Sequence, residues 1–193
     1  HLSNKKFFLQ KIKTNFQRKI HYLFRGKVIV FEGPDGSGKS TLANGVYTAL
    51  EKFPIKKEIV HFATYFKKSK PSALKRLITR KFSILKVYWD IFLGKLTITD
   101  RYIYLTFRKH HPIFGKILKF LAPKPDIIFV MKISPEEIRK RKIGHRDLLS
   151  PEMIKELYSV YDSIPGKIDI NTKKPIKENF EFITNLILER VLI

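Results

Sequence analysis

The chain has 193 residues, enough for one α/β domain with a substantial core, and its 44% apolar content excludes a disordered chain. It contains no cysteine, which excludes disulfides and thiolate metal sites and fits a reducing cytoplasm. Its 39 Lys and Arg against 17 Asp and Glu leave a net charge of +22, more than a cleft for small phosphates needs. Two explanations of the surplus weigh equally: a polyanionic partner, such as acidic lipid or nucleic acid, and a lysine-rich solvated surface.

Residues 1–26 carry seven Lys or Arg and no acidic residue. Apolar residues recur there near helical spacing, which predicts a basic amphipathic helix or linker ahead of a domain formed by residues 27–193. Such a helix could lie on an anionic membrane surface, placing a cytoplasmic protein at the membrane periphery. Docking on the domain or linking to another one is favoured, because amphipathic helices mostly pack on protein.

A glycine-rich stretch then joins a predicted strand to a predicted helix. Residues 27–30, Lys-Val-Ile-Val, are typical of a buried strand, and apolar residues recur at helical spacing over residues 42–50. Between them, residues 31–41 read Phe-Glu-Gly-Pro-Asp-Gly-Ser-Gly-Lys-Ser-Thr, which contains the pattern G-x-x-x-x-G-K-[ST]. The sequence therefore predicts a loop that binds the phosphates of a nucleoside triphosphate.

Each part of this loop has a chemical role. The glycines let successive backbone N–H groups point at an anion, and the helix N-terminus adds further donors and a positive dipole end. Lys39 would reach the β- and γ-phosphates, and the Ser40 hydroxyl would ligate Mg²⁺. The candidate nucleotide-binding residues are Gly33, Asp35, Gly36, Ser37, Gly38, Lys39, Ser40 and Thr41.

The next stretch is again strongly basic. Pro54 ends the first helix, and residues 58–63 predict a second strand. Residues 65–95 hold nine basic residues and one acid, Asp90, interleaved with apolar residues, which predicts one or two helices with a basic outer face. Because no stacking or helix-turn-helix signature accompanies it, we expect a positive rim around an anionic substrate rather than a nucleic-acid interface.

The third predicted strand, residues 96–100, ends in the carboxylate of Asp100, followed by Arg101 and Tyr102. Open parallel sheets bind ligands at the carboxyl ends of their strands. Asp100 is therefore a candidate to hold Mg²⁺ directly or through water. It could instead cap a helix, but the neighbouring Arg101 favours a functional role.

A basic segment follows the fourth predicted strand, residues 126–131. Ser134-Pro135 and Ser150-Pro151 each predict the start of a helix. The segment between these starts is hinged on glycine and suits a lid over transferring phosphates, because guanidinium groups stay charged and clamp oxygens in pairs. A solvated basic loop is the alternative. The candidate lid residues are Arg139, Arg141 and Arg146.

The last elements complete an alternating pattern. Residues 166–170 predict a fifth strand, and apolar spacing over residues 176–191 predicts a closing helix. Strands alternating with helices predict an α/β fold with a doubly wound, five-stranded parallel sheet flanked by helices in three layers.

From residue 26 onward, the chain resembles the thymidylate kinase family of nucleoside monophosphate kinases. The resemblance is carried by the glycine-rich motif with its internal Asp35, by Asp100-Arg101-Tyr102, and by residues 125–128 with the basic lid. It implies ATP as phosphoryl donor, Mg²⁺ as cofactor and nucleoside monophosphate, dTMP or a relative, as acceptor. It also implies that Asp35 faces the acceptor's sugar hydroxyl and Arg101 contacts its phosphate, and it is compatible with a homodimer.

The acceptor half of the site departs from that family. Residues 61–66 read His-Phe-Ala-Thr-Tyr-Phe where thymidylate kinases usually have Arg-Glu-Pro-Gly-Gly, and residues 103–108 lack the serine and the aromatic-glutamine pair that reads thymine. Two alternatives therefore stay open. One is a kinase of the same fold acting on a sugar or glycan intermediate. The other is a non-catalytic nucleotide-binding module that binds membrane or nucleic acid.

Overall fold

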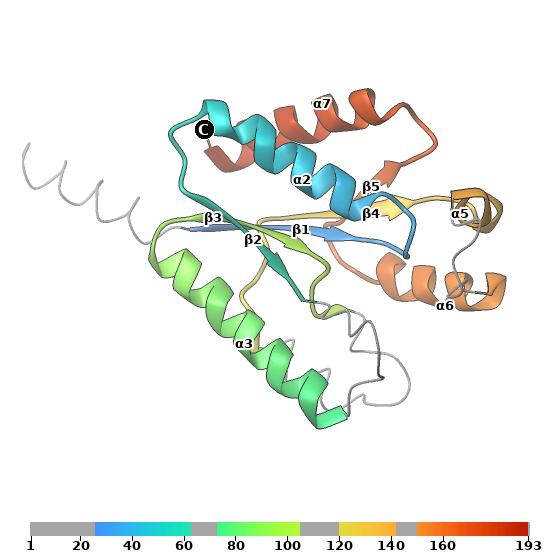
Figure 1. Ribbon diagram of the computed structural model, residues 1–193, viewed down its shortest axis with the longest axis horizontal. Helices are drawn as coiled ribbons and strands as arrows, with labels where there is room; N and C mark the ends of the chain where they lie inside the picture. The colour runs from blue at the N-terminus through green and yellow to red at the C-terminus, as the bar shows by residue number, and fades with distance from the viewer. Residues whose placement is uncertain (1–25, 63–72, 105–119, 142–149, 193) are drawn as a thin grey trace, which may run out of the picture.

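The computed structural model describes residues 26–62, 73–104, 120–141 and 150–192. Within them, five strands form one all-parallel sheet in the order β2-β3-β1-β4-β5 (Figure 1). The predicted α/β fold class is therefore confirmed. The strands are β1 (Lys27–Glu32), β2 (Lys57–His61), β3 (Leu96–Asp100), β4 (Ile127–Lys132) and β5 (Ile168–Asn171).

Helices cover both faces of this sheet. On one face lie α2 (Lys39–Ala49) and α7 (Ile176–Ile187), the latter continued by the π-helical turn η3 (Leu188–Leu192). On the other face lie α3 (Ala73–Phe92) and α6 (Pro151–Asp162). The short α5 (Pro135–Arg141) follows β4 at the carboxyl-end side of the sheet (Figure 1).

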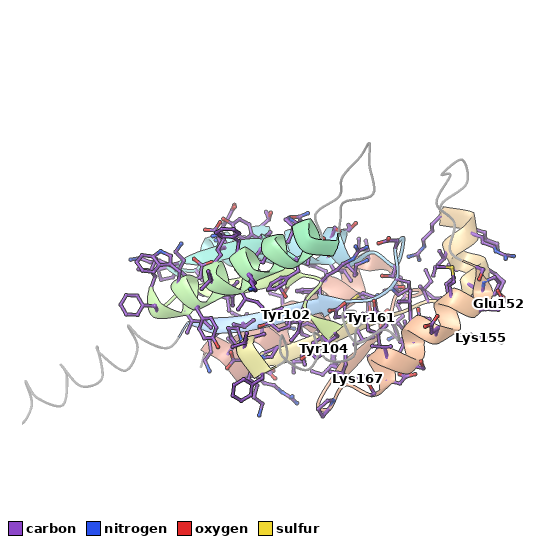
Figure 2. All side chains as sticks on the ribbon, turned by 90° about the horizontal axis from the view of Figure 1, so that it is seen from below. Tyr102, Tyr104, Glu152, Lys155, Tyr161 and Lys167 are labelled. Carbon is purple, nitrogen blue, oxygen red and sulfur yellow. The ribbon has the colours of Figure 1, made fainter. Side chains whose placement is uncertain are left out.

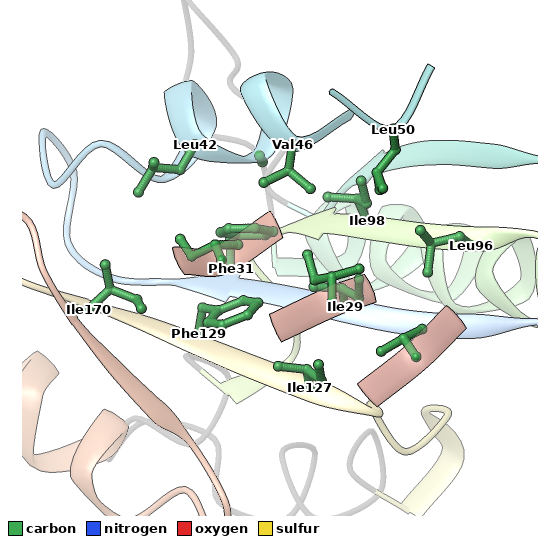
Figure 3. Packing of buried hydrophobic residues seen from close by; sticks show 14 of the residues in the cluster. Ile29, Phe31, Leu42, Val46, Leu50, Leu96, Ile98, Ile127, Phe129 and Ile170 are labelled. Carbon is green, nitrogen blue, oxygen red and sulfur yellow. The ribbon is translucent and has the colours of Figure 1, made fainter. Parts of the chain in front are cut away.

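The strands form because they are buried on both sides. Parallel strands covered by helices are typically continuous apolar runs, and Val28–Phe31 of β1 are almost completely buried. Under α2 and α7, the ring of Phe31 packs on that of Phe129 at 5.3 Å between centroids (Figure 3). Gly45 brings these helices close together, since a Cβ there would lie 3.2 Å from the Phe180 ring.

The order of strands creates the place for a ligand. The chain leaves β1 toward β2 on one side of the sheet, then crosses from β3 to β4 on the other side of β1. Loops that leave in opposite directions open a crevice at the carboxyl ends of the strands. In β1 and β3, Phe31 is paired with Asp100, so the glycine-rich loop and Asp100 lie at the same edge.

Most predicted elements occur within one or two residues of their expected bounds. Residues 65–95 contain one described helix, α3, and the first helix ends in the 3₁₀ turn η1 (Leu50–Lys52) ahead of Pro54. Ser150 caps α6 by accepting a hydrogen bond from the Met153 N–H at 3.3 Å. No helix in the described part of the chain is long and apolar enough to cross a membrane. The predicted helix over residues 1–26 lies outside the described residues, apart from Gly26.

Candidate functional site

The loop between β1 and α2 has a backbone that requires glycine. Gly33, Gly36 and Gly38 all have positive φ angles, of 147°, 87° and 93°. At Gly33 space is also limiting, since a Cβ would lie 2.8 Å from the Ser37 hydroxyl and 2.9 Å from the Met131 Cβ. Residues with positive φ that alternate with residues of ordinary negative φ turn consecutive N–H groups toward one side, which makes a concave anion-binding surface.

The N-terminus of α2 is left open in a way that suits an anion. The helix begins directly after Gly38, and no side chain caps it. Its first turn also contains no acidic residue. The first backbone N–H groups of a helix have no partner within the helix, and together with its dipole they favour negative charge. The helix that begins here is eleven residues long.

Lys39, the first residue of α2, lies back against the loop. Its side chain is 5% exposed, and its ammonium group donates to the Pro34 carbonyl at 2.9 Å and lies 3.6 Å from Asp35. The cation is thereby held close to the loop backbone. The predicted contact with the β- and γ-phosphates stays a prediction.

Ser40 and Asp100 meet, although 60 residues separate them in the sequence. The Ser40 hydroxyl donates to Asp100 Oδ2 at 2.6 Å, and the His61 Nδ1 lies 3.4 Å from the same oxygen. In the described part of the chain, no group of three or more His, Cys, Asp or Glu forms a closed metal cage. A hydroxyl and one carboxylate fit Mg²⁺, which binds few protein oxygens and keeps waters or takes phosphate oxygens as its other ligands.

Asp35 and Arg101 form an ion pair with each other. Arg101 has a positive φ of 67°, which is uncommon for a residue with a side chain, and its N–H donates to the Phe31 carbonyl at 2.9 Å. The pair links the glycine-rich loop to the end of β3. The resemblance to thymidylate kinases implied separate contacts to the acceptor for these two residues, and their mutual pairing was not predicted.

Glu32 is a site residue that sequence reasoning missed. Its side chain is fully buried at the end of β1; Oε1 accepts a hydrogen bond from the Tyr102 N–H at 2.7 Å, and Oε2 has no hydrogen-bond partner among the described residues. Burial raises the pKa of Glu32 to about 7, against the opposing effects of the Tyr102 N–H and of the charges of Lys39 and Arg101. A carboxylate closing an otherwise apolar strand, next to the loop, is the signal that could have identified it.

Three buried tyrosines lie near this carboxyl group on the α3 and α6 side of the sheet. Tyr102, Tyr104 and Tyr161 lie near one another in the same buried cluster (Figure 2). Burial raises the pKa of Tyr161, with a further contribution from nearby Glu32, while Arg101 and the Gly33 backbone act in the opposite direction. Burial raises the pKa of Tyr102 and of Tyr104 as well, so all three hydroxyl groups stay neutral near pH 7.

The predicted lid residues are only partly described. Arg139 is exposed on α5. Arg141 donates to the Thr172 carbonyl at 2.8 Å and lies 3.5 Å from Glu137, so its guanidinium connects α5 to the end of β5. Arg146 lies outside the described residues. The role of the three arginines over the phosphates stays a prediction.

No protein-family model matches this chain, and a search of curated proteins finds no significant match. The geometry of the loop, the helix end and the Asp100 edge therefore carries the functional argument.

Proposed function

We propose that this chain is an ATP- and Mg²⁺-dependent phosphotransferase, similar to thymidylate kinases, that moves the γ-phosphoryl group of ATP to a nucleoside monophosphate, dTMP or a relative. The observation that supports it most is the 2.6 Å contact between the Ser40 hydroxyl and Asp100 beside an uncapped helix and a glycine-rich loop. Two oxygen atoms that can ligate a metal ion meet there, next to a surface that attracts phosphate. Phosphoryl transfer needs mainly this combination of positioning and charge neutralisation.

The donor phosphates are bound mainly by backbone in this proposal. The N–H groups at Gly33, Gly36, Ser37 and Gly38, with the open end of α2, surround the β-phosphate. Lys39 exchanges its Pro34 carbonyl for phosphate oxygens, a small movement because its ammonium already lies at the loop. Thr41, in the first turn of α2, completes the nucleotide-binding residues.

Ser40 and Asp100 would hold Mg²⁺, with His61 beside Asp100. The metal supplies positive charge that neutralises phosphate oxygens during transfer. The Ser40 hydroxyl donates to Asp100, so the two oxygens are already placed together. That prior arrangement lowers the cost of organising the site.

The acceptor side depends on Arg101 and Asp35. A guanidinium group binds phosphate in a two-pronged geometry, and the ion pair with Asp35 holds it at the end of β3 beside the loop. Asp35, held beside Arg101, would accept a hydrogen bond from a hydroxyl group of the same acceptor. The lid arginines, where they close, exclude water that would otherwise hydrolyse ATP.

The test is an ADP-release assay with Mg·ATP over dTMP, other nucleoside monophosphates, and free and phosphorylated sugars. We expect acceptor-dependent release with a nucleoside monophosphate, lowered at least about a hundredfold by Lys39→Ala through loss of charge stabilisation. Lys52→Ala, an exposed lysine on η1, is the matched control and should keep activity. Near-normal turnover of folded Lys39→Ala would refute the phosphate-loop assignment. Turnover with sugars alone would replace the acceptor class, and nucleotide binding without any turnover would refute the kinase.

A further inference from the structure

The outer face of α3 exposes an unusual amount of apolar surface. The helix packs its inner side, with Ile84 and Val87 buried, onto β1, β2 and β3. On the opposite side, large apolar residues are exposed on the helix and just after it. These residues are Phe82, Leu85, Tyr88, Trp89, Phe92 and Leu93. At 3.6 residues per turn they span an arc of about 140°, much of one side of the helix.

A second segment extends this face. Phe120 is 88% exposed and Leu121 is also exposed. A surface depression at the amino ends of β1 and β4 is lined by both Tyr88 and Ala122, so the segment that contains Phe120 and Leu121 reaches α3 at Ala122. Of the twelve large apolar side chains exposed in the described part of the chain, eight belong to these two segments. Single exposed apolar residues are ordinary, but a concentration of this kind marks a binding surface. We call it the α3 face.

Charge identifies the kind of partner. Residues 1–125 hold 27 Lys and Arg against 6 Asp and Glu, whereas residues 126–193 hold 12 against 11. On the α3 face, Lys81 is exposed within the apolar arc and Lys86 lies at its edge. Glu58 and Asp90 both pair with Lys86 and with Lys95, which offsets the charge of Lys86, so the cation within the arc is Lys81. The α3 face is thus apolar and cationic together.

Three other occupants fit this combination poorly. A second copy of the chain would place the lysines of one α3 face against those of the other, which repel each other. Residues 1–25 would be repelled in the same way, because they are basic and contain no acid. Nucleic acid is recognised mainly through polar contacts to phosphates and base edges, which Leu85 and Leu93 cannot make. An anionic bilayer suits both properties, because its interface takes up Trp, Tyr, Phe and Leu while its headgroups attract lysine.

We propose that the α3 face is the surface by which this protein lies on an anionic lipid bilayer. The path of the chain agrees with this, since the Gly26 N–H donates to the Ile91 carbonyl at 3.1 Å. Gly26, which directly follows the seven basic residues of positions 1–25 in the sequence, is thus held at the end of the same helix. The association is peripheral: apolar side chains enter the interface, and no chemistry at the candidate site is required. The proposal goes beyond the phosphotransferase and does not depend on it.

The chain offers a direct probe, because Trp89 is its single tryptophan. The full chain is mixed with vesicles of phosphatidylcholine alone or with added phosphatidylglycerol. We expect co-sedimentation with the anionic vesicles only, a blue shift of Trp89 emission, and quenching of that emission by lipids brominated in their acyl chains. High salt should release the protein by screening the lysines.

A pair of double variants tests the surface itself. Phe82→Ser with Phe92→Ser should weaken vesicle binding about tenfold or more by removing inserted apolar area. Ile176→Ser with Phe182→Ser on α7 is the matched control on the opposite face of the sheet, and binding should be unchanged. All four side chains are more than half exposed, so neither pair removes core packing.

Four results would overturn the proposal. Vesicle binding without a shift of Trp89 emission would locate the contact elsewhere. Equal weakening of vesicle binding by both double variants would do the same. Another is a dimer whose Trp89 emission is already shifted in buffer, which would identify a second copy as the occupant. The last is that the protein shows no preference for anionic over neutral vesicles.

Discussion

Replacing Glu32 by Gln should change how the stability of this protein depends on pH. The carboxyl group is fully buried, and one of its oxygens lacks a hydrogen-bond partner among the described residues. Burial raises the pKa of Glu32 from 4.5 to about 7 in the folded protein. Between these two values the folded chain keeps a proton that the unfolded chain has released. The free energy of unfolding therefore falls as pH rises through this window.

The magnitude follows from the same numbers. At about 1.4 kcal/mol per pH unit, a window from pH 4.5 to about 7 corresponds to about 3 kcal/mol of lost stability. Glu32→Gln keeps the shape and can still accept from the Tyr102 N–H, but it cannot ionise. The free energy of unfolding of the variant, minus that of the wild type, should thus rise by about 3 kcal/mol from pH 4.5 to pH 8. Any constant difference between the two proteins at low pH does not affect this change.

Urea unfolding followed by far-ultraviolet circular dichroism at a series of pH values measures this difference. Glu51→Gln, which removes an exposed carboxylate on η1, controls for the change in net charge. If wild-type and Glu32→Gln stabilities plotted against pH ran parallel, the buried carboxyl group would not titrate in this window and the reasoning would fail.

Two further predictions concern the loop and the metal-binding edge. Gly33→Ala should lower the free energy of unfolding by about 2–4 kcal/mol in urea titrations, since its Cβ would collide with Met131 in addition to the strain of positive φ. Gly38→Ala, with open space around its Cβ, should cost only the strain of about 1–2 kcal/mol, and equal losses at both positions would contradict the geometry. Asp100→Asn should raise the Mg²⁺ concentration for half-maximal ADP release about tenfold or more, as should Ser40→Ala. Unchanged Mg²⁺ dependence in both variants would remove the proposed metal site.

Local chemistry accounts for the elements that were predicted well. The bounds of β3, Leu96–Asp100, were predicted as observed, because a short run rich in β-branched residues ended in a charged residue. The helix starts at Pro135 and Pro151 were identified from a serine cap with proline in the first turn. Each of these signals involves residues a few positions apart, so the sequence displays it directly.

The observed bounds of two strands differ from the predicted ones because hydrogen bonds to neighbouring strands set them. β4 begins at Ile127 rather than Asp126, whose side chain instead accepts from the Val28 N–H at 2.9 Å. β1 extends to Glu32 because β4 pairs with it as far as Val130. Hydrogen bonds between strands that are distant in sequence set these limits.

The sequence by itself determined the fold class, the strand-loop-helix order around residues 33–38, and the chemical types at the loop and at Asp100. Only the tertiary structure decided which of these groups meet. Parallel pairing of β1 with β3 brings Ser40 to Asp100, Asp35 to Arg101, and the Glu32 carboxyl group to the Tyr102 N–H. It also decided which side of α3 is covered, and so left Trp89 exposed. Periodicity defines the faces of a helix, but burial, with the pKa shift that it causes, depends on what packs against each face.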